Sequence, residues 1–237
     1  MDYITKMLDI IYPPRCPLCN DIIPWFEEKR ICTGCLEKSP IIEGPRCTKC
    51  SKPVFHQEIT HCFDCHKQEL AYEKGWSLWS YEEPVKKAIY QYKYHNKREY
   101  APLFAKELVS EFKSDIEKYN IGTIVPVPLS KKRQRTRGYN QAYLLAKEIG
   151  KLLDKEVVEL LERHLDTLPQ KELNDKERLK NLNKVFSVNN DKKVLNNILI
   201  VDDIYTTGST INACAMSIKE HYDTDIYYIC IAIGKGI

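Results

Sequence analysis

Two adjacent carboxylates near the C-terminus stand directly before a turn rich in hydroxyl side chains. Asp202 and Asp203 follow the apolar run 198–201, which reads as a strand buried on both faces of a parallel sheet. The turn Thr206–Thr210 would begin a helix, whose first backbone N–H groups lack partners within the helix and attract anions. Paired acids can hold sugar hydroxyls, directly or through Mg²⁺. The run therefore predicts a site for a phosphorylated ribose.

The expected position of these residues supports the same interpretation. In an open α/β sheet, ligands bind in the crevice outside the carboxyl ends of the strands, and both acids stand where the strand should end. The alternative is a buried strand, an acidic turn and an ordinary capped helix. That alternative does not explain why two adjacent acids precede a Thr-Thr-Gly sequence.

Eight of the ten cysteines form four regular pairs within the first 65 residues, and each pair encloses two residues. One such pair can bind Zn²⁺ through two thiolates, and a second pair completes the tetrahedron. The pattern therefore predicts two structural four-cysteine zinc sites, with metal supplying folding energy to segments too short to form much core. The pairs are Cys16/Cys19, Cys32/Cys35, Cys47/Cys50 and Cys62/Cys65.

Several alternatives remain open for this array. Disulfides, free thiols and an iron–sulfur cluster are weaker interpretations, because nothing in the chain indicates secretion and four thiolates suit zinc. We expect sequential sites, with the first two pairs on one zinc, while a cross-braced arrangement would join the first pair to the third. His56, His61 and His66 are expected outside the ligand set. A saturated zinc has no open position, so the module is structural or an interaction surface.

The composition fits a protein with a sizeable core and limits the function classes. The chain has 237 residues, 43% of them hydrophobic and 29% charged, and a formal net charge of +3. This charge excludes a globally polybasic nucleic-acid binder but allows a local basic patch. No apolar run approaches the roughly 20 residues of a membrane span, and the N-terminus lacks the pattern of a signal peptide. We therefore expect a cytoplasmic protein.

The middle of the chain alternates between strand and helix patterns, which predicts a parallel sheet flanked by helices. Cys214 and Cys230 fall in the last predicted helix and strand, and we expect both to be buried thiols. Strands are expected at 76–81, 121–127, 157–161, 198–201 and 225–233, and helices at 82–94, 101–112 and 142–153.

Two basic segments in this region could contact anions. The segment 93–98 mixes cations with Tyr94 and His95, so it could bind nucleic acid by stacking and charge, or form a solvated helix junction with Tyr94 tucked inward. The second follows the strand 121–127 and places five cations in the seven residues 131–137. Arginine binds phosphate oxygens two at a time, so this end of the sheet suits pyrophosphate, although charge runs are commonly solvated faces.

These motifs together resemble a known family. The run 198–210 resembles the signature of type I phosphoribosyltransferases for 5-phosphoribosyl-1-pyrophosphate (PRPP). The cysteine pairs, the Pro126–Ser130 strand end and the sequence 137–141 (Arg-Gly-Tyr-Asn-Gln) extend the similarity to the ComF family over nearly the whole chain. A later segment with Gln170, Arg178, Asn181 and Phe186 also fits.

The resemblance implies roles for individual residues and a division into two parts. Asp202 and Asp203 would contact the ribose hydroxyls, and Mg²⁺ would accompany PRPP. The double zinc-finger module would cover 16–70 and the phosphoribosyltransferase-like domain 76–237. Before them, the helical spacing of Ile4, Met7, Leu8 and Ile11 predicts an N-terminal helix at 1–15, which would pack against the protein body or lie on a membrane surface. The 5′-phosphate would be wrapped by Thr206, Thr207, Gly208, Ser209 and Thr210, and the pyrophosphate would meet Ser130, Arg135 and Arg137.

The family resemblance implies a link to natural competence, in which cells take up single-stranded DNA. The first functional hypothesis is a PRPP-dependent transferase that moves the pentose to a nitrogen nucleophile. The second is a non-catalytic protein that binds single-stranded DNA or another competence protein, with PRPP as a regulatory ligand. A nucleobase-salvage enzyme ranks last, because no residues specify a base pocket and the zinc array is foreign to such enzymes.

Overall fold

The protein is an α/β structure with a cysteine-rich N-terminal region, described here from a computed structural model. The structure describes residues 13–24, 31–38, 40–164 and 185–234. Its helices are α2 (Thr33–Lys38), α3 (Phe63–Lys67), α4 (Val85–Tyr94), α5 (Tyr100–Lys118), α6 (Lys131–Arg137), α7 (Gln141–Leu153) and α9 (Ser209–Lys219). Its strands are β1 (Lys74–Ser80), β2 (Ile121–Pro126), β3 (Glu156–Val157), β4 (Leu161–Arg163), β5 (Phe186–Val188), β6 (Asn197–Tyr205) and β7 (Ile226–Ile233).

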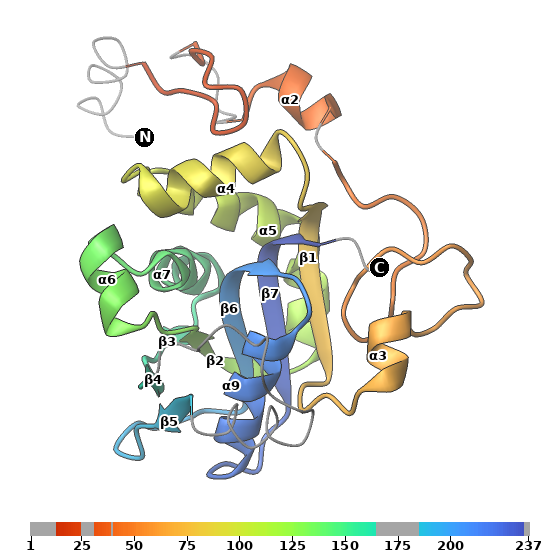
Figure 1. Ribbon diagram of the computed structural model, residues 1–237, viewed down its shortest axis with the longest axis vertical. Helices are drawn as coiled ribbons and strands as arrows, with labels where there is room; N and C mark the ends of the chain where they lie inside the picture. The colour runs from red at the N-terminus through yellow and green to blue at the C-terminus, as the bar shows by residue number, and fades with distance from the viewer. Residues whose placement is uncertain (1–12, 25–30, 39, 165–184, 235–237) are drawn as a thin grey trace, which may run out of the picture.

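The main sheet has five parallel strands in the order β1-β7-β6-β2-β3, and it runs through the centre of the molecule in Figure 1. Its central strand β6 is built from the aliphatic run predicted to be buried on both faces, and residues 198–201 are all fully buried. The prediction of a parallel sheet flanked by helices is confirmed.

The connections on the two sides of the sheet run in opposite directions. From β2 the chain passes through α6 and α7 to the outer strand β3, whereas from β6 it passes through α9 to β7 on the other side. Strands β2 and β6 are neighbours, so their connections diverge between them. Such a divergence point is where open α/β sheets bind ligands, outside the carboxyl ends of the strands.

Successive residues of β6 face opposite sides of the sheet, and each side has its own core. Leu199 and Val201 pack in the core that contains residues of α4, α5 and α7. Ile198 and Ile200 pack in the core that contains residues of α9 and of the small antiparallel pair β4-β5. The elements that follow β2 and β6 therefore cover opposite faces.

The two halves of the cysteine-rich region join different cores. Residues of the first half, including Cys16 and Cys35, pack with the helices α4 and α5, whereas Cys47, Cys50 and Cys65 pack with the α9 side. Figure 1 shows α2 above α4, and α3 beside β1. The N-terminal region thus contacts both faces of the sheet.

Several predicted boundaries differ from the structure. The strand expected at 157–161 is wrong, because residues 156–157 form the short edge strand β3 and Leu161 begins β4 in a separate sheet. The cationic run after β2 forms the helix α6. The strand β6 continues through both acids to Tyr205, because β7 keeps pairing with it. Most of the helix predicted at 1–15 lies outside the described residues. Gln170, Arg178 and Asn181 also lie outside them.

Candidate functional site

The carboxyl end of β6 projects beyond its neighbour β2. The last residue pair between them is Pro126 with Val201, followed by a 3.0 Å hydrogen bond from the Val127 N–H to the Val201 carbonyl. On the other side, pairing with β7 continues as far as Tyr205 and Ile233. The segment 202–205 therefore has a ladder partner on one side only, and both acids lie at the divergence point of the sheet.

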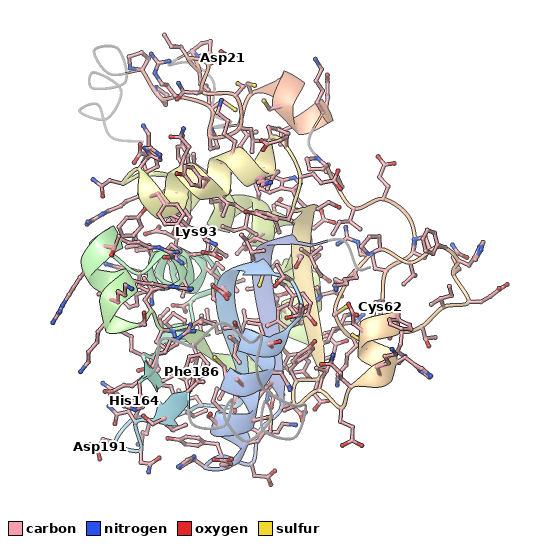
Figure 2. The ribbon with its side chains drawn as sticks, viewed as in Figure 1. Asp21, Cys62, Lys93, His164, Phe186 and Asp191 are labelled. Atoms are coloured by element: carbon pink, nitrogen blue, oxygen red, sulfur yellow. The ribbon has the colours of Figure 1, made fainter. Side chains whose placement is uncertain are left out.

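Asp203 is almost completely buried, at 4% exposure, and two side chains hold its carboxylate. The Lys93 ammonium lies 2.9 Å from Oδ1, and the Gln141 side-chain amide donates a 2.8 Å hydrogen bond to Oδ2. Lys93 comes from the last turn of α4, and Gln141 is the first residue of α7. Figure 2 shows Lys93 on the side of α4 that faces the end of the sheet. The buried charge is therefore paired and hydrogen-bonded, as burial requires.

Asp202 faces the opposite side of the sheet, as the alternation of strand side chains requires. It is partly buried, and its Oδ1 accepts a 2.8 Å hydrogen bond from the Asp203 N–H. Burial, and then the negative charge of Asp203, raise the pKa of Asp202 to about 7, while Lys93 acts in the opposite direction. The two acids thus have different environments: one is locked in an ion pair, and the other can exchange a proton near neutral pH.

The turn between β6 and α9 presents its polar groups to solvent. Thr206 and Thr207 are exposed, and the hydroxyls of Thr207 and Ser209 lie 2.8 Å apart. Gly208 caps α9 with a φ of 80°, in the left-handed region that favours glycine. Thr210 lies in the first helical turn, where backbone N–H groups have no acceptor within the helix. This turn can therefore bind an anion.

The sequence 137–141 has a local structural purpose at each position. Gly138 ends α6 with a φ of 75°, and the Asn140 side chain caps α7 by accepting from the N–H groups of Ala142 and Tyr143. The Tyr139 hydroxyl bonds to the Tyr92 carbonyl, which joins the start of α7 to α4. The motif thereby places the side chain of Gln141 within hydrogen-bonding distance of Asp203.

The predicted pyrophosphate residues occupy three different settings. Ser130 is 3% exposed and caps α6, since its Oγ accepts from the Arg133 N–H at 3.3 Å. Arg135 is exposed on α6. Arg137 lies over the ring of Tyr94 at 4.8 Å and donates a 3.0 Å hydrogen bond to its hydroxyl. Only Arg137 of the three is thereby tied to α4, the helix that also supplies Lys93.

Lys93 and Gln141 belong to the candidate site through their contacts with Asp203, and the sequence motifs did not assign them to it. Both lay in segments that the sequence singled out, the basic stretch 93–98 and the motif 137–141. Neither segment indicates a contact with Asp203, because the contacts span 110 and 62 positions of the chain. A buried carboxylate needs a cation or a hydrogen-bond donor as its partner, and this requirement is the only indication in the sequence that such residues must exist.

An exposed surface of α4 and α6 combines aromatic rings with cations. We call this surface the α4/α6 groove; it has a volume of about 280 Å³ and is lined by Tyr94, Lys132, Arg133, Thr136 and Arg137. Tyr94 is 51% exposed, so it is not tucked inward, and its ring lies 5.0 Å from that of Tyr90, which is 54% exposed. No acid among the described residues forms an ion pair with a cation of α6.

The eight paired cysteines form two compact groups. The sulfur atoms within each group all lie within 4.8 Å of one another. The Cys19 and Cys32 sulfurs are 3.7 Å apart, and those of Cys50 and Cys62 are 3.6 Å apart. Tetrahedral zinc with Zn–S bonds of about 2.3 Å separates its sulfurs by about 3.8 Å. The first cysteine cluster is Cys16, Cys19, Cys32 and Cys35, and the second cysteine cluster is Cys47, Cys50, Cys62 and Cys65.

The two clusters fit two structural zinc sites, and the sequential arrangement of pairs is confirmed. All ten cysteines are free of disulfides, and Cys214 and Cys230 are buried as predicted. His56, His61 and His66 belong to neither cluster. Among the helices that the structure describes, none has both the length and the apolar character needed to cross a bilayer.

The sequence of this chain is similar to those of known proteins. Residues 7–66 match the double zinc ribbon domain. Competence protein F of Haemophilus influenzae is 30% identical over 212 residues, which cover 87% of this chain and 91% of that protein. Competence protein ComFC of Bacillus subtilis is 29% identical, over 81% of this chain and 79% of its own length. DNA utilization protein YhgH of Escherichia coli is 26% identical, over 85% and 89%. The chain is therefore a member of the ComF family of competence proteins.

Proposed function

We propose that the protein binds PRPP in the crevice beyond β2 and β6 and that it acts in DNA uptake. The observation that carries the proposal is the arrangement at the end of β6. The two acids and the hydroxyl-rich turn 206–210 that leads into α9 are separated by only two residues, and they stand together at the divergence point of a parallel sheet. Acids suit the hydroxyls of ribose, and the turn suits its 5′-phosphate.

Each residue of the site would have a separate task in holding the ligand. Asp202 and Asp203 would accept hydrogen bonds from the ribose hydroxyls, and the turn 206–210 would surround the phosphate with hydroxyl and N–H donors. Lys93 and Gln141 hold Asp203 in place before the ligand arrives. Such prior positioning lowers the cost of ordering a site during binding.

The pyrophosphate would lie toward α6, where Arg137 and Arg135 supply positive charge. Arg137 would have to exchange its contact with Tyr94 for one with phosphate oxygens, or bind them from the same position. Mg²⁺ would neutralise pyrophosphate when the ligand is bound. If the protein is an enzyme, the reaction would be transfer of the pentose to a nitrogen nucleophile. These cations would then stabilise the pyrophosphate leaving group.

Isothermal titration with PRPP and MgCl₂ tests this site. We expect saturable binding to the wild type, and at least roughly a tenfold loss in Asp202→Asn, because one ionic acceptor for the sugar is removed. Asp223→Asn is the matched control, since Asp223 is an exposed acid beyond α9. Equal affinity in the wild type and Asp202→Asn would remove the proposal.

The role in DNA uptake is supported by the names of the relatives. Two are competence proteins and one is a DNA utilization protein. We expect this chain to restore transformation in a Bacillus subtilis strain that lacks ComFC, measured as transformants per cell. Asp202→Asn should restore it less well if the PRPP site serves uptake. A chain that is expressed but gives no transformants would count against the role.

The α4/α6 groove favours a second candidate function, binding of single-stranded DNA. Exposed rings can stack on bases while the cations of α6 contact phosphates. Anisotropy with a labelled oligonucleotide should show affinity that falls steeply with salt. Tyr94→Ala should weaken binding by about 1–3 kcal/mol, whereas Lys147→Ala, an exposed cation of α7, should leave it unchanged. No binding at low salt would exclude this function.

A further inference from the structure

A buried group of three tyrosines lies directly beneath the turn that follows β6. We call Tyr72, Tyr205 and Tyr228 the tyrosine cluster, and their exposures are 0%, 2% and 0%. The rings of Tyr205 and Tyr228 stack with centroids 4.8 Å apart and planes within 5°. Tyr72 stands edge-on to both, and its hydroxyl lies 2.7 Å from that of Tyr205. The three side chains thus form one continuous set of ring and hydroxyl contacts.

One end of the tyrosine cluster is attached to the second cysteine cluster. The Tyr228 hydroxyl donates a 2.9 Å hydrogen bond to the carbonyl of Cys50, one of the four thiolate residues. The Gly75 backbone lies flat on the Tyr228 ring, where any side chain would collide with the ring. Gly75 is itself hydrogen-bonded to the segment that carries the second cysteine cluster, which we call the second ribbon (residues 47–65), because its N–H donates to the Lys49 carbonyl at 2.9 Å. The position of Tyr228 therefore depends on the backbone around Cys50.

The other end of the tyrosine cluster supports the proposed phosphate turn. Tyr205 is the last residue of β6, and its ring folds back under Gly208, so that a Cβ at Gly208 would collide with the Tyr205 hydroxyl. A second link runs beside the first, because the Asn212 side chain of α9 accepts a 2.7 Å hydrogen bond from the Ala71 N–H. The N-terminal end of α9 thus rests on residues that the second ribbon positions.

A cation of the second ribbon also approaches Tyr205. Lys52 is 3% exposed, its ammonium lies 5.9 Å from the centroid of the Tyr205 ring, and it pairs with Asp64 at 2.5 Å. Asp64 stands between Cys62 and Cys65 in the sequence. The ribbon therefore contacts Tyr205 through a charge as well as through Tyr228.

Among the residues that the structure describes, no equivalent connection joins the first cysteine cluster to the turn. Its buried members Cys16 and Cys35 belong to the core of α4, α5 and α7, which contains none of the three tyrosines. The chain therefore carries two four-cysteine clusters of the same kind, of which only the second is joined to the turn through described contacts. One cluster can serve as the control for the other.

We propose that Tyr205 is a positioning residue through which the second cysteine cluster sets the conformation of the turn 206–210, and thereby its affinity for the 5′-phosphate. The affinity part rests on the proposed PRPP site. Metal in the second cluster fixes the Cys50 turn, that turn fixes Tyr228, and the stacked Tyr205 fixes Gly208 and the start of α9. Without metal at this cluster the same contacts would transmit disorder to the turn.

The test compares Cys62→Ser with Cys19→Ser in the full-length protein, because both cysteines are partly exposed members of their clusters. Zinc content is measured first, and hydrogen exchange of the amides 206–212 is followed by mass spectrometry without ligand. We expect faster exchange in this segment for Cys62→Ser alone. PRPP affinity should fall roughly five- to tenfold in Cys62→Ser, which is the size of an ordinary coupling between two sites. In Cys19→Ser it should remain within about twofold of the wild type.

A second pair of variants leaves both clusters intact. Tyr72→Phe removes the hydroxyl that meets Tyr205, whereas Tyr100→Phe removes one from a buried tyrosine of the other core. We expect faster exchange at 206–212 in the first variant only, with zinc content unchanged in both. This pair decides the matter if Cys62→Ser does not fold.

The outcomes separate this proposal from the proposed function. If the wild type does not bind PRPP, the ligand assignment fails, while the exchange measurements still decide whether the second cluster controls the turn. Equal exchange at 206–212 in Cys62→Ser and Cys19→Ser, or in Tyr72→Phe and Tyr100→Phe, would overturn the positioning role of Tyr205.

Discussion

The ammonium of Lys93 lies 2.9 Å from a carboxylate oxygen of Asp203, in a setting where neither side chain is more than 17% exposed. The contact joins the last turn of α4 to the end of the central strand. Among the described residues, Lys93 is the cation that forms an ion pair with the acids that we propose as the ribose site. The stability of the fold and the charge of the site therefore depend on the same ion pair.

Replacing Lys93 by methionine should destabilise the protein by about 3 kcal/mol, because Asp203 would be left as a buried charge without its cation. Urea denaturation followed by circular dichroism measures the change in the free energy of unfolding. Lys147→Met is the matched control, because Lys147 is exposed on α7. A loss below about 0.5 kcal/mol, the range of ordinary surface substitutions, would show that the pair contributes little.

The Asp202 carboxyl should make stability depend on pH. Its pKa is raised from 3.8 to about 7 in the folded protein, so between these values the unfolded chain has lost a proton that the folded chain keeps. Stability should therefore fall as pH rises from about 4 to 7, and the full cost should persist above pH 7. Asp202→Asn removes this cost, so it should be more stable than wild type by roughly 2–4 kcal/mol at pH 8.

The measurement is the urea midpoint of both proteins at pH 8 and pH 5.5. The advantage of Asp202→Asn should shrink at the lower pH, where the wild-type carboxyl stays protonated when folded. PRPP binding by the wild type should weaken over the same interval, since an ionised Asp202 is the better acceptor. An advantage that does not change with pH would contradict the raised pKa.

Zinc content provides a test in solution of the sequential arrangement of the cysteine pairs. Elemental analysis should find two zinc ions per wild-type chain and one in Cys16→Ser or Cys47→Ser. The double variant should lose both ions, because its two cysteines belong to different clusters. Retention of one ion in the double variant would mean that the first and third pairs share a metal. Cys214→Ser, outside both clusters, should retain two ions.

Gly208→Ala should damage the turn at the end of β6. The new methyl group would collide with the Tyr205 ring, and the φ of 80° disfavours any residue with a Cβ. We expect a loss of about 1–3 kcal/mol in stability together with weaker PRPP binding. Thermal denaturation and titration measure both effects. Gly34→Ala, at a position with open space around it, should change neither.

The sequence predicted well those features that depend on neighbouring residues. The aliphatic runs of β6 and β7, the amphipathic helices α5 and α7, and the cysteine pairs follow from local patterns, and all are found in the structure. The helix α6 was missed because its seven residues bury no side chain, so no apolar periodicity marks them. The pair β4-β5 was missed because each strand has only three residues.

Within the candidate site, the residue types were predictable and their partners were not. The acids and the hydroxyl turn are contiguous in sequence, so their proximity was certain. The extension of β6 past Val201 depends on pairing with β7, which no local pattern reveals. The same applies to Lys93, Gln141 and the three tyrosines, whose contacts join segments far apart in the chain.

The pairing of β1 with β7 has a consequence for how the protein is made. The strand β1 emerges from the ribosome long before β7, yet β7 is its only partner strand in the described sheet. Both cysteine clusters can bind zinc early in synthesis, because the four cysteines of each cluster are close in sequence. The docking surface of the second cysteine cluster includes Tyr228 of β7, so it is complete only after β7 is synthesised. A nascent chain therefore carries the segment of the second cysteine cluster undocked until β7 has been made, and truncation before β7 should leave that segment without part of its docking surface.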